Sequence, residues 1–297
     1  MSVIDRLLSP DSSFQKRFFF LARRFVPGET IDSALDVVSE LNAAGMSATL
    51  DFLGEDILEP EAAAHTREVY VQMLDAISTR RLNTNVSVKL TALGMLIDEQ
   101  LALQNLLTIL ERAQSNADPF VRIDMEGSAV TDKTLRVFER AYATHQNVGP
   151  VLQAYLRRTP ADVERMTAIK ARVRLCKGAY REPPAIAFQE MPTIRREYLK
   201  SAERLLLTGN YPGIATHDVR LIESIKRFSA QYGVPADRFE FQMLYGVRPQ
   251  VQHDLVEQGY RVRIYIPFGT HWAGYFYRRI LERRENAVFA LSSMFTK

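Results

Sequence analysis

The chain has 297 residues, of which 46% are hydrophobic and 25% are charged, and its formal net charge at pH 7 is +3. This length and apolar content can bury a large core, which indicates a globular protein with one large α/β domain or two small ones. The basic residues are scattered rather than clustered in a run, so we expect no nucleic-acid partner. The single cysteine, Cys176, excludes an internal disulfide and a cysteine-based metal cluster, and it fits a reducing compartment.

Charged residues interrupt the N-terminal segment. Asp5, Lys16, Arg17 and Arg23 separate its apolar residues, so the sequence shows neither a secretory apolar region nor an apolar span of about 18 residues. We therefore expect a soluble or peripherally attached protein. The aromatic triplet 18–20 lies between basic residues and could contact a membrane surface, although such a triplet in a helix is more often part of a core.

Short β-branched or apolar runs recur along the chain and predict eight strands. They lie at residues 49–54, 85–94, 119–127, 149–156, 171–180, 211–218, 239–246 and 261–269. The segments between them are charged and have helical periodicity, as at 60–82, 99–114, 131–144 and 218–232. Strands that alternate with helices pair in parallel, because a helical crossover returns the chain to the same edge.

Eight such units predict a closed (β/α)8 barrel of the TIM type with extra N-terminal helices. We expect a single domain over residues 1–297, in which 1–46 form the extra helices and 47–297 form the barrel and a C-terminal helix, because no linker-like stretch divides the chain. Three prolines, Pro60, Pro160 and Pro249, lie at plausible first-turn positions of helices. Asp218 can cap the helix after the sixth strand. Residues 181–192, with two adjacent prolines, are the predicted irregular insertion.

Polar residues gather at the predicted C-terminal strand ends, where a barrel of this type has its active site. They are Lys89, Asp124, Gln153, Arg174, Lys177, Thr216, His217, Gln242 and Tyr265. Each alone is more often a satisfied structural partner, but their recurrence through successive units predicts one site. Their chemistry suggests donors for a heterocycle, phosphate contacts from Lys177, Thr216 and His217, and aromatic walls for a small apolar substrate. The sequence has no G-x-G-x-x-G motif, so a dinucleotide would not be held by a Rossmann turn.

The predicted last helix places Tyr275, Arg278, Arg279, Glu282 and Asn286 on one face. Adjacent arginines provide rigid forks that can grip a planar carboxylate. The alternative is a solvated basic helix with pairs between its own glutamates and arginines. We expect no metal site, because the histidines, His217 and His271 among them, lack metal-binding spacing.

These residues resemble the proline dehydrogenase family of flavin-dependent (β/α)8 enzymes. The similarity is carried by VSVKLT at 86–91, RIDME at 122–126, QAYL at 153–156, RLCKGAY at 174–180, ATH at 215–217, FQMLYG at 241–246, YIPFG at 265–269 and the final YxxRRxxExxxN at 275–286. The chain lacks regions like the DNA-binding and aldehyde dehydrogenase parts of the bifunctional members, so it resembles the short monofunctional bacterial type.

The resemblance implies a role for each matching position. Lys89, Arg278 and Arg279 would ion-pair the carboxylate of proline, while Tyr180, Leu244, Tyr265 and Tyr275 would wall its ring. FAD would be held by Gln153, Arg174, Lys177, Gly178, Ala179, Thr216, His217, Gln242 and Glu282. Asp124, Tyr180 and Arg174 would be the catalytic positions, with Asp124 beside Tyr265 and Arg174 toward the flavin N5 atom. Glu55 would pair with Arg278 as a gate.

The implied reaction moves a hydride equivalent from C5 of neutral-amine L-proline to FAD, giving Δ1-pyrroline-5-carboxylate, and a membrane quinone then takes the electrons. This is the first step of proline catabolism to glutamate, and the implied location is the cytoplasm, with peripheral contact to the inner face of the cell membrane. Two other interpretations stay open at this point: an aldolase-like lyase with Lys89 as a Schiff-base lysine, and a barrel that binds a partner without turnover.

Overall fold

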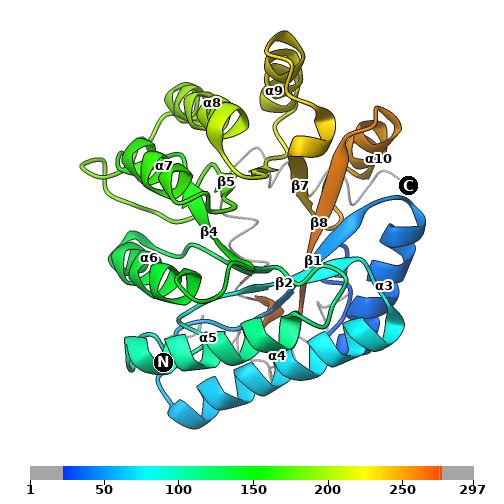
Figure 1. Ribbon diagram of the computed structural model, residues 1–297, viewed down its shortest axis with the longest axis vertical. Coiled ribbons are helices and arrows are strands. Elements are labelled where there is room, and N and C mark those ends of the chain that lie inside the picture. Colours follow the sequence, from blue (N-terminus) through cyan, green and yellow to red (C-terminus); the bar gives the residue numbers. More distant parts are fainter. Residues whose placement is uncertain (1–22, 274, 276–297) are drawn as a thin grey trace.

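The computed structural model describes residues 23–273 and 275, within which eight parallel strands close into a barrel in chain order (Figure 1). The strands are β1 (Ser47–Phe52), β2 (Thr84–Val88), β3 (Val121–Ile123), β4 (Val148–Gln153), β5 (Arg174–Cys176), β6 (Gly213–Ala215), β7 (Glu240–Leu244) and β8 (Arg261–Phe268). Strand β8 pairs with β1, which closes the sheet. The predicted (β/α)8 barrel is therefore confirmed.

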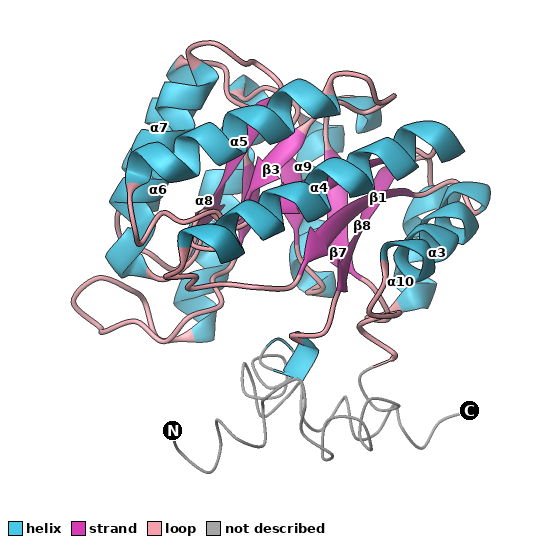
Figure 2. Ribbon diagram, turned by 90° about the horizontal axis from the view of Figure 1, so that it is seen from below, coloured by secondary structure: helices cyan, strands magenta, loops and turns pink. Residues whose placement is uncertain are grey.

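Helices surround the strands, as the side view also shows (Figure 2). They are α3 (Ile31–Ala43), α4 (Pro60–Arg80), α5 (Glu99–Ala113), α6 (Ser128–Tyr142), α7 (Thr159–Ala168), α8 (Met191–Thr208), α9 (Val219–Gln231) and α10 (Pro249–Glu257), with the short 3-10 turn η1 (Ala236–Arg238) before β7. Helix α3 precedes β1, as predicted for the extra N-terminal helices. The triplet 18–20 lies outside the described residues.

The predicted helix starts are confirmed, because the three prolines lie in the first turns of helices and Asp218 caps one. Pro60 and Pro249 are the first residues of α4 and α10, and Pro160 is the second residue of α7. Asp218 caps α9, where its side chain accepts a hydrogen bond from the Arg220 amide at 3.2 Å. The insertion predicted at 181–192 is irregular up to residue 190, and its last two residues begin α8.

The core lies between the strands and the helices, because alternate strand residues point to opposite sides of the sheet. Apolar residues occupy the outward side: Ala48, Leu50, Val86, Val88, Val121, Ile123, Leu175, Ile214, Phe241, Met243, Val262 and Ile264. Buried polar residues occupy the inward side: Thr49, Asp51, Asn85, Ser87, Arg122, Gln153, Arg174, Glu240, Gln242 and Arg263. Barrels of this type are usually filled by branched apolar layers. This interior therefore has to be held together by hydrogen bonds and ion pairs.

Several predicted strands were too long at their C-terminal ends. The run predicted as a strand at 85–94 ends at Val88, and residues 90–96 form turns in which Leu90 and Leu93 are buried. Buried apolar residues in a turn give the same hydrophobic signal as a strand, which is the reason for the error. Because the strands end earlier than predicted, Lys89, Asp124 and Lys177 are each the first residue after a strand and not part of it.

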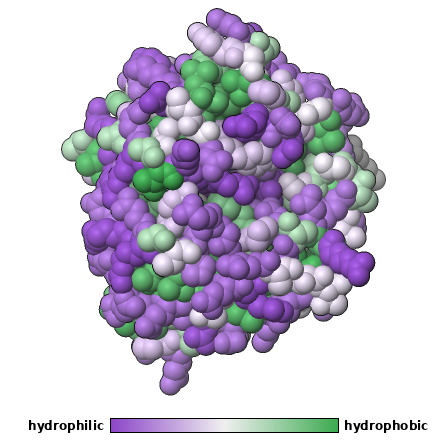
Figure 3. Space-filling view, in the orientation of Figure 1, coloured by the Kyte–Doolittle hydropathy of each residue, from purple (hydrophilic) through white to green (hydrophobic). Residues whose placement is uncertain are grey.

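The face of the molecule seen in Figure 3 is mostly hydrophilic, and its hydrophobic residues form separate small groups. Within residues 23–273 and 275, no helix is both long enough and apolar enough to cross a membrane.

Candidate active site

Asp124 is the centre of the polar cluster at the C-terminal ends of the strands. One carboxylate oxygen accepts hydrogen bonds from Arg174 Nη1 and Ser87 Oγ, each at 2.7 Å, and the other accepts one from the Tyr265 hydroxyl at 2.7 Å. Burial alone would raise the pKa of Asp124, but the charges of Arg174 and Lys89 lower it below its ordinary value. Asp124 is therefore an anion that fixes three side chains from three other strands.

Lys89 forms a buried ion pair that sequence reasoning missed. Its Nζ lies 2.8 and 2.7 Å from the two oxygens of Asp51 and 3.8 Å from Asp124 Oδ2. Burial would lower the pKa of Lys89, but the attraction of Asp51 and Asp124 raises it. Asp51 could have been found, because an acidic residue inside the apolar run TLDFL at 49–53 is the same signal that singled out Lys89.

Arg174 is held from below by Gln242. The Arg174 Nε donates to Gln242 Oε1, and Gln242 Nε2 donates to Glu240 Oε1 at 2.5 Å. Glu240 in turn accepts from Arg263 Nε at 2.8 Å. Arg174 Nη2 has no hydrogen-bond partner among the described residues, so one donor of this buried cation is available to a ligand.

Gln153 connects the ends of three strands. Its amide nitrogen donates to the Glu126 carbonyl at 3.0 Å, and its oxygen accepts from the Ala179 amide at 3.3 Å. The Glu126 side chain, which sequence reasoning did not assign, accepts hydrogen bonds from the Thr91 hydroxyl at 2.5 Å and the Thr91 amide at 3.3 Å. Burial raises the pKa of Glu126 to about 7, against the opposing effect of Thr91 and Lys89.

A second charged group joins the ends of β5 and β6. Lys177 Nζ and Arg195 Nε each lie 2.7 Å from Asp218 Oδ2. Burial would raise the pKa of Asp218, but these two cations and their hydrogen bonds lower it to about 2. Lys177 and Arg195 thus bring two cationic donor groups together at one carboxylate, and such donors are suited to phosphate. Arg195 was missed because it comes from α8 and not from a strand end.

Thr216 and His217 shape the loop after β6. The Thr216 hydroxyl accepts a hydrogen bond from the Asp218 amide at 3.1 Å, and His217 Nε2 accepts one from the Leu244 amide at 2.7 Å. The Nε2 lone pair of His217 is thus engaged by the backbone of the next strand, which leaves it unsuited to bind a metal through that atom. Among the described residues, no group of three or more histidines, cysteines and carboxylates could hold a metal ion.

Aromatic side chains lie close to the cationic residues. The Arg174 guanidinium lies 5.3 Å from the centre of the Tyr265 ring. Two other predicted wall residues are half-buried: Tyr180 in the loop after β5 and Leu244 at the end of β7. Tyr275 is buried in a small cluster with Leu53.

The remaining predicted positions are placed only in part. Arg278, Arg279 and Glu282 lie outside the described residues, and Glu55 is half-buried in the loop after β1.

The residues present fit a flavin in chemical type. An acidic site would reject an anionic cofactor. Here Arg174 keeps a donor available, and Lys177 and Arg195 bring two cationic donor groups together at Asp218. Gly178 has φ +126°, and a Cβ there would collide with the Tyr155 ring. The glycine therefore lets the chain between Lys177 and Ala179 pass close to its neighbours, as a loop against a planar ligand must.

The fold and these strand-end residues define a (β/α)8-barrel enzyme with a cationic and aromatic active site. A family model described as proline dehydrogenase matches residues 34–291, so the chain belongs to the proline dehydrogenase family. The protein is thus an oxidoreductase that acts on proline, in a family that is flavin-dependent in general.

Relatives of similar length support this assignment. Proline dehydrogenase 1 of Bacillus subtilis is 41% identical over 276 residues, covering 93% of this chain and 91% of the relative. The proline dehydrogenase of Deinococcus radiodurans is 36% identical over 285 residues, covering 94% and 92%. The crystal structure of proline utilization A from Bdellovibrio bacteriovorus, inactivated by N-propargylglycine, superposes with a TM-score of 0.84 at 26% identity. It covers 92% of this chain but only 34% of that much longer chain.

Proposed function

We propose that the protein oxidises L-proline to Δ1-pyrroline-5-carboxylate with FAD as cofactor and a membrane quinone as electron acceptor, as the first step of proline catabolism to glutamate. The observation that carries this proposal is the arrangement around Asp124. The Asp124 carboxylate binds both Arg174, which has a donor available, and the hydroxyl of Tyr265, whose ring forms an aromatic wall. The buried cation Lys89 lies beside this carboxylate.

The carboxylate of proline binds Lys89 together with Arg278 and Arg279. An ammonium group has three hydrogens, and Asp51 takes two of those of Lys89 at 2.8 and 2.7 Å. The third is available to the substrate. Asp51 thus keeps Lys89 protonated and fixed in position, so that proline does not have to order this side chain when it binds.

Binding of the carboxylate orients the ring between the tyrosines and the cofactor. Tyr265 packs against the ring, and its hydroxyl stays on Asp124. With Arg278 and Arg279, the cations Lys89 and Arg174 outnumber the carboxylates Asp51 and Asp124. This ring of cations disfavours a protonated amine, which helps proline lose its ammonium proton to solvent before oxidation. When bound, the flavin supplies the acceptor for the hydride equivalent that leaves C5.

Cofactor contacts divide between two groups of residues. Gln153 and Arg174 contact the ring system. The ribityl, pyrophosphate and adenosine parts are held by Lys177, Gly178, Ala179, Thr216, His217 and Gln242, with Glu282 of the predicted last helix. Arg195 joins the second group, because it shares Asp218 with Lys177.

Access to the site is controlled by Glu55 and Arg278, which pair when proline is bound and separate to release product. In a double-mutant cycle of Glu55→Ala and Arg278→Met, we expect slower flavin reduction from each change and a combined loss smaller than the sum. Additive losses would show that the two residues act separately. Contact with the inner face of the cell membrane completes the proposal, since the acceptor quinone is held in the bilayer.

The visible spectrum tests the proposal directly. The purified protein should have flavin bands near roughly 380 and 450 nm that bleach when L-proline is added without oxygen. Extracted cofactor should be FAD rather than FMN, and a soluble quinone analogue should restore the bands. A colourless preparation that oxidises proline at full rate would refute the flavin proposal.

The lyase alternative is disfavoured by the site itself. A Schiff-base lysine has to lose its proton, and such lysines have lowered pKa values. The pKa of Lys89 is instead raised by Asp51 and Asp124. Borohydride trapping of a carbonyl substrate on Lys89 would reverse this conclusion.

A further inference from the structure

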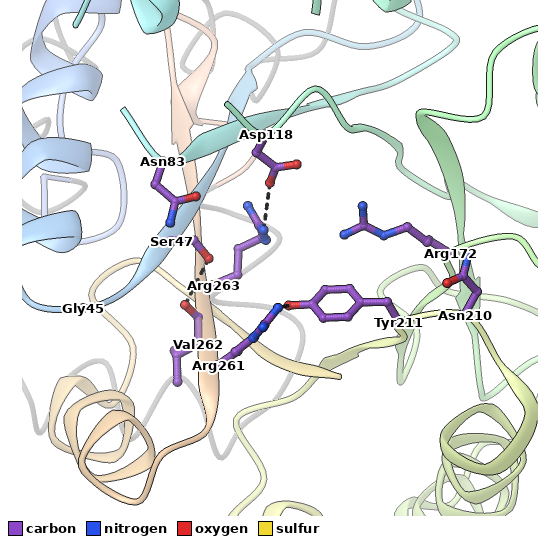
Figure 4. A pocket seen from close by; sticks show the side chains of 10 residues that line it. All are labelled: Gly45, Ser47, Asn83, Asp118, Arg172, Asn210, Tyr211, Arg261, Val262 and Arg263. Atoms are coloured by element: carbon purple, nitrogen blue, oxygen red, sulfur yellow. Dashed lines mark hydrogen bonds and ion pairs between the residues drawn. The ribbon is translucent and has the colours of Figure 1, made fainter. Parts of the chain in front are cut away.

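A cavity of about 560 Å³ opens at the N-terminal end of the barrel, at the opposite end of the strands from the active site (Figure 4). Its walls come from residues just before or near the start of six strands: Ser47, Asn83, Asp118, Arg172, Asn210, Tyr211, Arg261 and Arg263. Pockets that hold small molecules have volumes of about 300–1,000 Å³. The cavity is therefore large enough for a small metabolite.

The carboxylates at this end are already engaged. Arg263 Nη2 lies 2.9 Å from Asp118 Oδ2, and Arg263 Nε lies 2.8 Å from Glu240 Oε1. Asp118 also accepts a hydrogen bond from Asn85 at 2.9 Å, and Glu240 accepts from the Tyr211 hydroxyl at 3.1 Å. The negative charges of Asp118 and Glu240 are therefore already paired with Arg263.

Arg172 and Arg261 have no such partner. Neither lies within 4.0 Å of a carboxylate in residues 23–273 and 275, and Arg172 Nε is buried without a hydrogen bond. Figure 4 shows Arg172 extending into the cavity from the side opposite Asp118 and Arg263. An unpartnered buried guanidinium nitrogen costs free energy unless a ligand supplies an acceptor.

Tyr211 holds the two arginines in place. Its ring centre lies 4.8 Å from the Arg172 guanidinium and 5.5 Å from that of Arg261, whose Nη1 also donates to the Tyr211 hydroxyl at 3.3 Å. Arg172 further stacks on Phe120 at 4.1 Å. Stacking fixes the planes of guanidinium groups but leaves their edges free to donate. Tyr211 itself has a left-handed backbone with φ 47°, a strained conformation that often occurs at binding sites.

Positive charge is in excess around the cavity. Arg122 is buried behind it and donates to the Pro150 and Arg172 carbonyls rather than to a carboxylate. Burial, together with the neighbouring charges of Arg174 and Arg172, lowers the pKa of Arg122 well below its ordinary value. A bound anion would relieve this repulsion.

We propose that this cavity is a binding site for a small oxyanion, a phosphate or a carboxylate, held by Arg172 and Arg261. Planar guanidinium forks match the oxygen pairs of both groups. Asn83 and Ser47 provide neutral polar atoms on the wall opposite Arg172 (Figure 4). The site is separate from the proline site, because its residues stand at the other ends of the same strands.

Thermal unfolding of the flavin-loaded protein tests the proposal. Sodium phosphate and sodium succinate are titrated separately against sodium chloride at equal ionic strength, so that general salt effects cancel. We expect phosphate, succinate or both to raise the melting temperature of the wild type in a saturable way. The anion that saturates at the lower concentration identifies the better ligand.

Variants assign the effect to the cavity. Arg172→Gln and Arg261→Gln should each weaken the apparent affinity at least about tenfold, since each removes a charge-assisted bidentate contact. Arg172→Lys retains the charge and should bind more weakly than wild type but better than Arg172→Gln. Arg227→Gln on the outer face of α9, an exposed arginine, is the matched control and should bind like wild type. The absence of a saturable shift in the wild type, or an equal shift in Arg261→Gln, would overturn the proposal.

Discussion

Lys89 and Asp51 form a buried, two-oxygen ion pair between the ends of β2 and β1, with Nζ to oxygen distances of 2.8 and 2.7 Å. The side chain of Asp51 is 1% exposed and that of Lys89 is 10% exposed, so the pair is shielded from water except on the side that faces the site. The pair therefore holds a positive charge in place at the spot where the proposed substrate carboxylate binds.

Asp51→Asn should destabilise the protein strongly, because it removes the carboxylate that is hydrogen-bonded to buried Lys89 and leaves only the longer ion pair with Asp124, at 3.8 Å. Breaking a buried pair by removing one partner costs about 3–5 kcal/mol. Urea unfolding measures the change. Asp75→Asn, which breaks the exposed pair with Arg112, is the control and should cost about 0–1 kcal/mol. Equal losses for the two variants would contradict a special role for Asp51.

Tyr265→Phe and Tyr265→Ser separate the hydroxyl of Tyr265 from its ring. The Phe variant loses a hydrogen bond to the Asp124 carboxylate, which is worth about 1.5–3 kcal/mol of folding stability. Because this bond also fixes the ring against the substrate, we expect kcat/KM for proline to fall in the Phe variant as well. The Ser variant also opens space beside the substrate ring. The ratio of activity on trans-4-hydroxyproline to activity on proline should rise several-fold in the Ser variant and not in the Phe variant. An unchanged ratio in both would place the ring away from C4.

Glu126 should make the stability of the protein fall as pH rises. Burial raises its pKa from 4.5 to about 7, so between these values the folded protein keeps a proton that the unfolded chain loses. Its contribution to stability is thus complete below about pH 4.5 and is lost as pH rises through about 7. In Glu126→Gln this dependence should disappear. Melting temperatures of both proteins from pH 5 to 8 provide the measurement, and parallel curves would contradict the assignment.

Much of this site could be predicted from the sequence, because parallel strands bring their carboxyl ends to one place and polar residues in apolar runs mark those ends. Asp124, Arg174 and Tyr265 were singled out on that basis, and the structure joins them. Arg195 could not be predicted in this way, since it reaches Asp218 from a helix with an ordinary amphipathic pattern.

The ion pairs within the barrel were hidden for a different reason. Arg263 and Glu240 alternate with apolar neighbours, as solvent-facing strand residues do. Only the closure of the sheet into a barrel places their side of the sheet in the interior. The partner of each charge then depends on register across neighbouring strands, which sequence periodicity does not specify. The same limit explains why the cavity between Arg172 and Arg261 was not foreseen.

Gly178→Ala should damage both the fold and cofactor binding. A side chain at φ +126° is strained, and the added carbon would meet the Tyr155 ring, which is buried against Leu156 and Ile194 and cannot move aside cheaply. Gly233→Ala, at φ +66° with open space around it, carries backbone strain without a collision and is the matched control. Backbone strain alone costs about 1–3 kcal/mol. We expect the control to lose no more than this and to keep its flavin, and the Gly178 variant to lose more stability and most of its flavin. Calorimetric unfolding together with the ratio of flavin to protein absorbance checks both parts, and equal behaviour of the two variants would show that the space beside Tyr155 is not limiting.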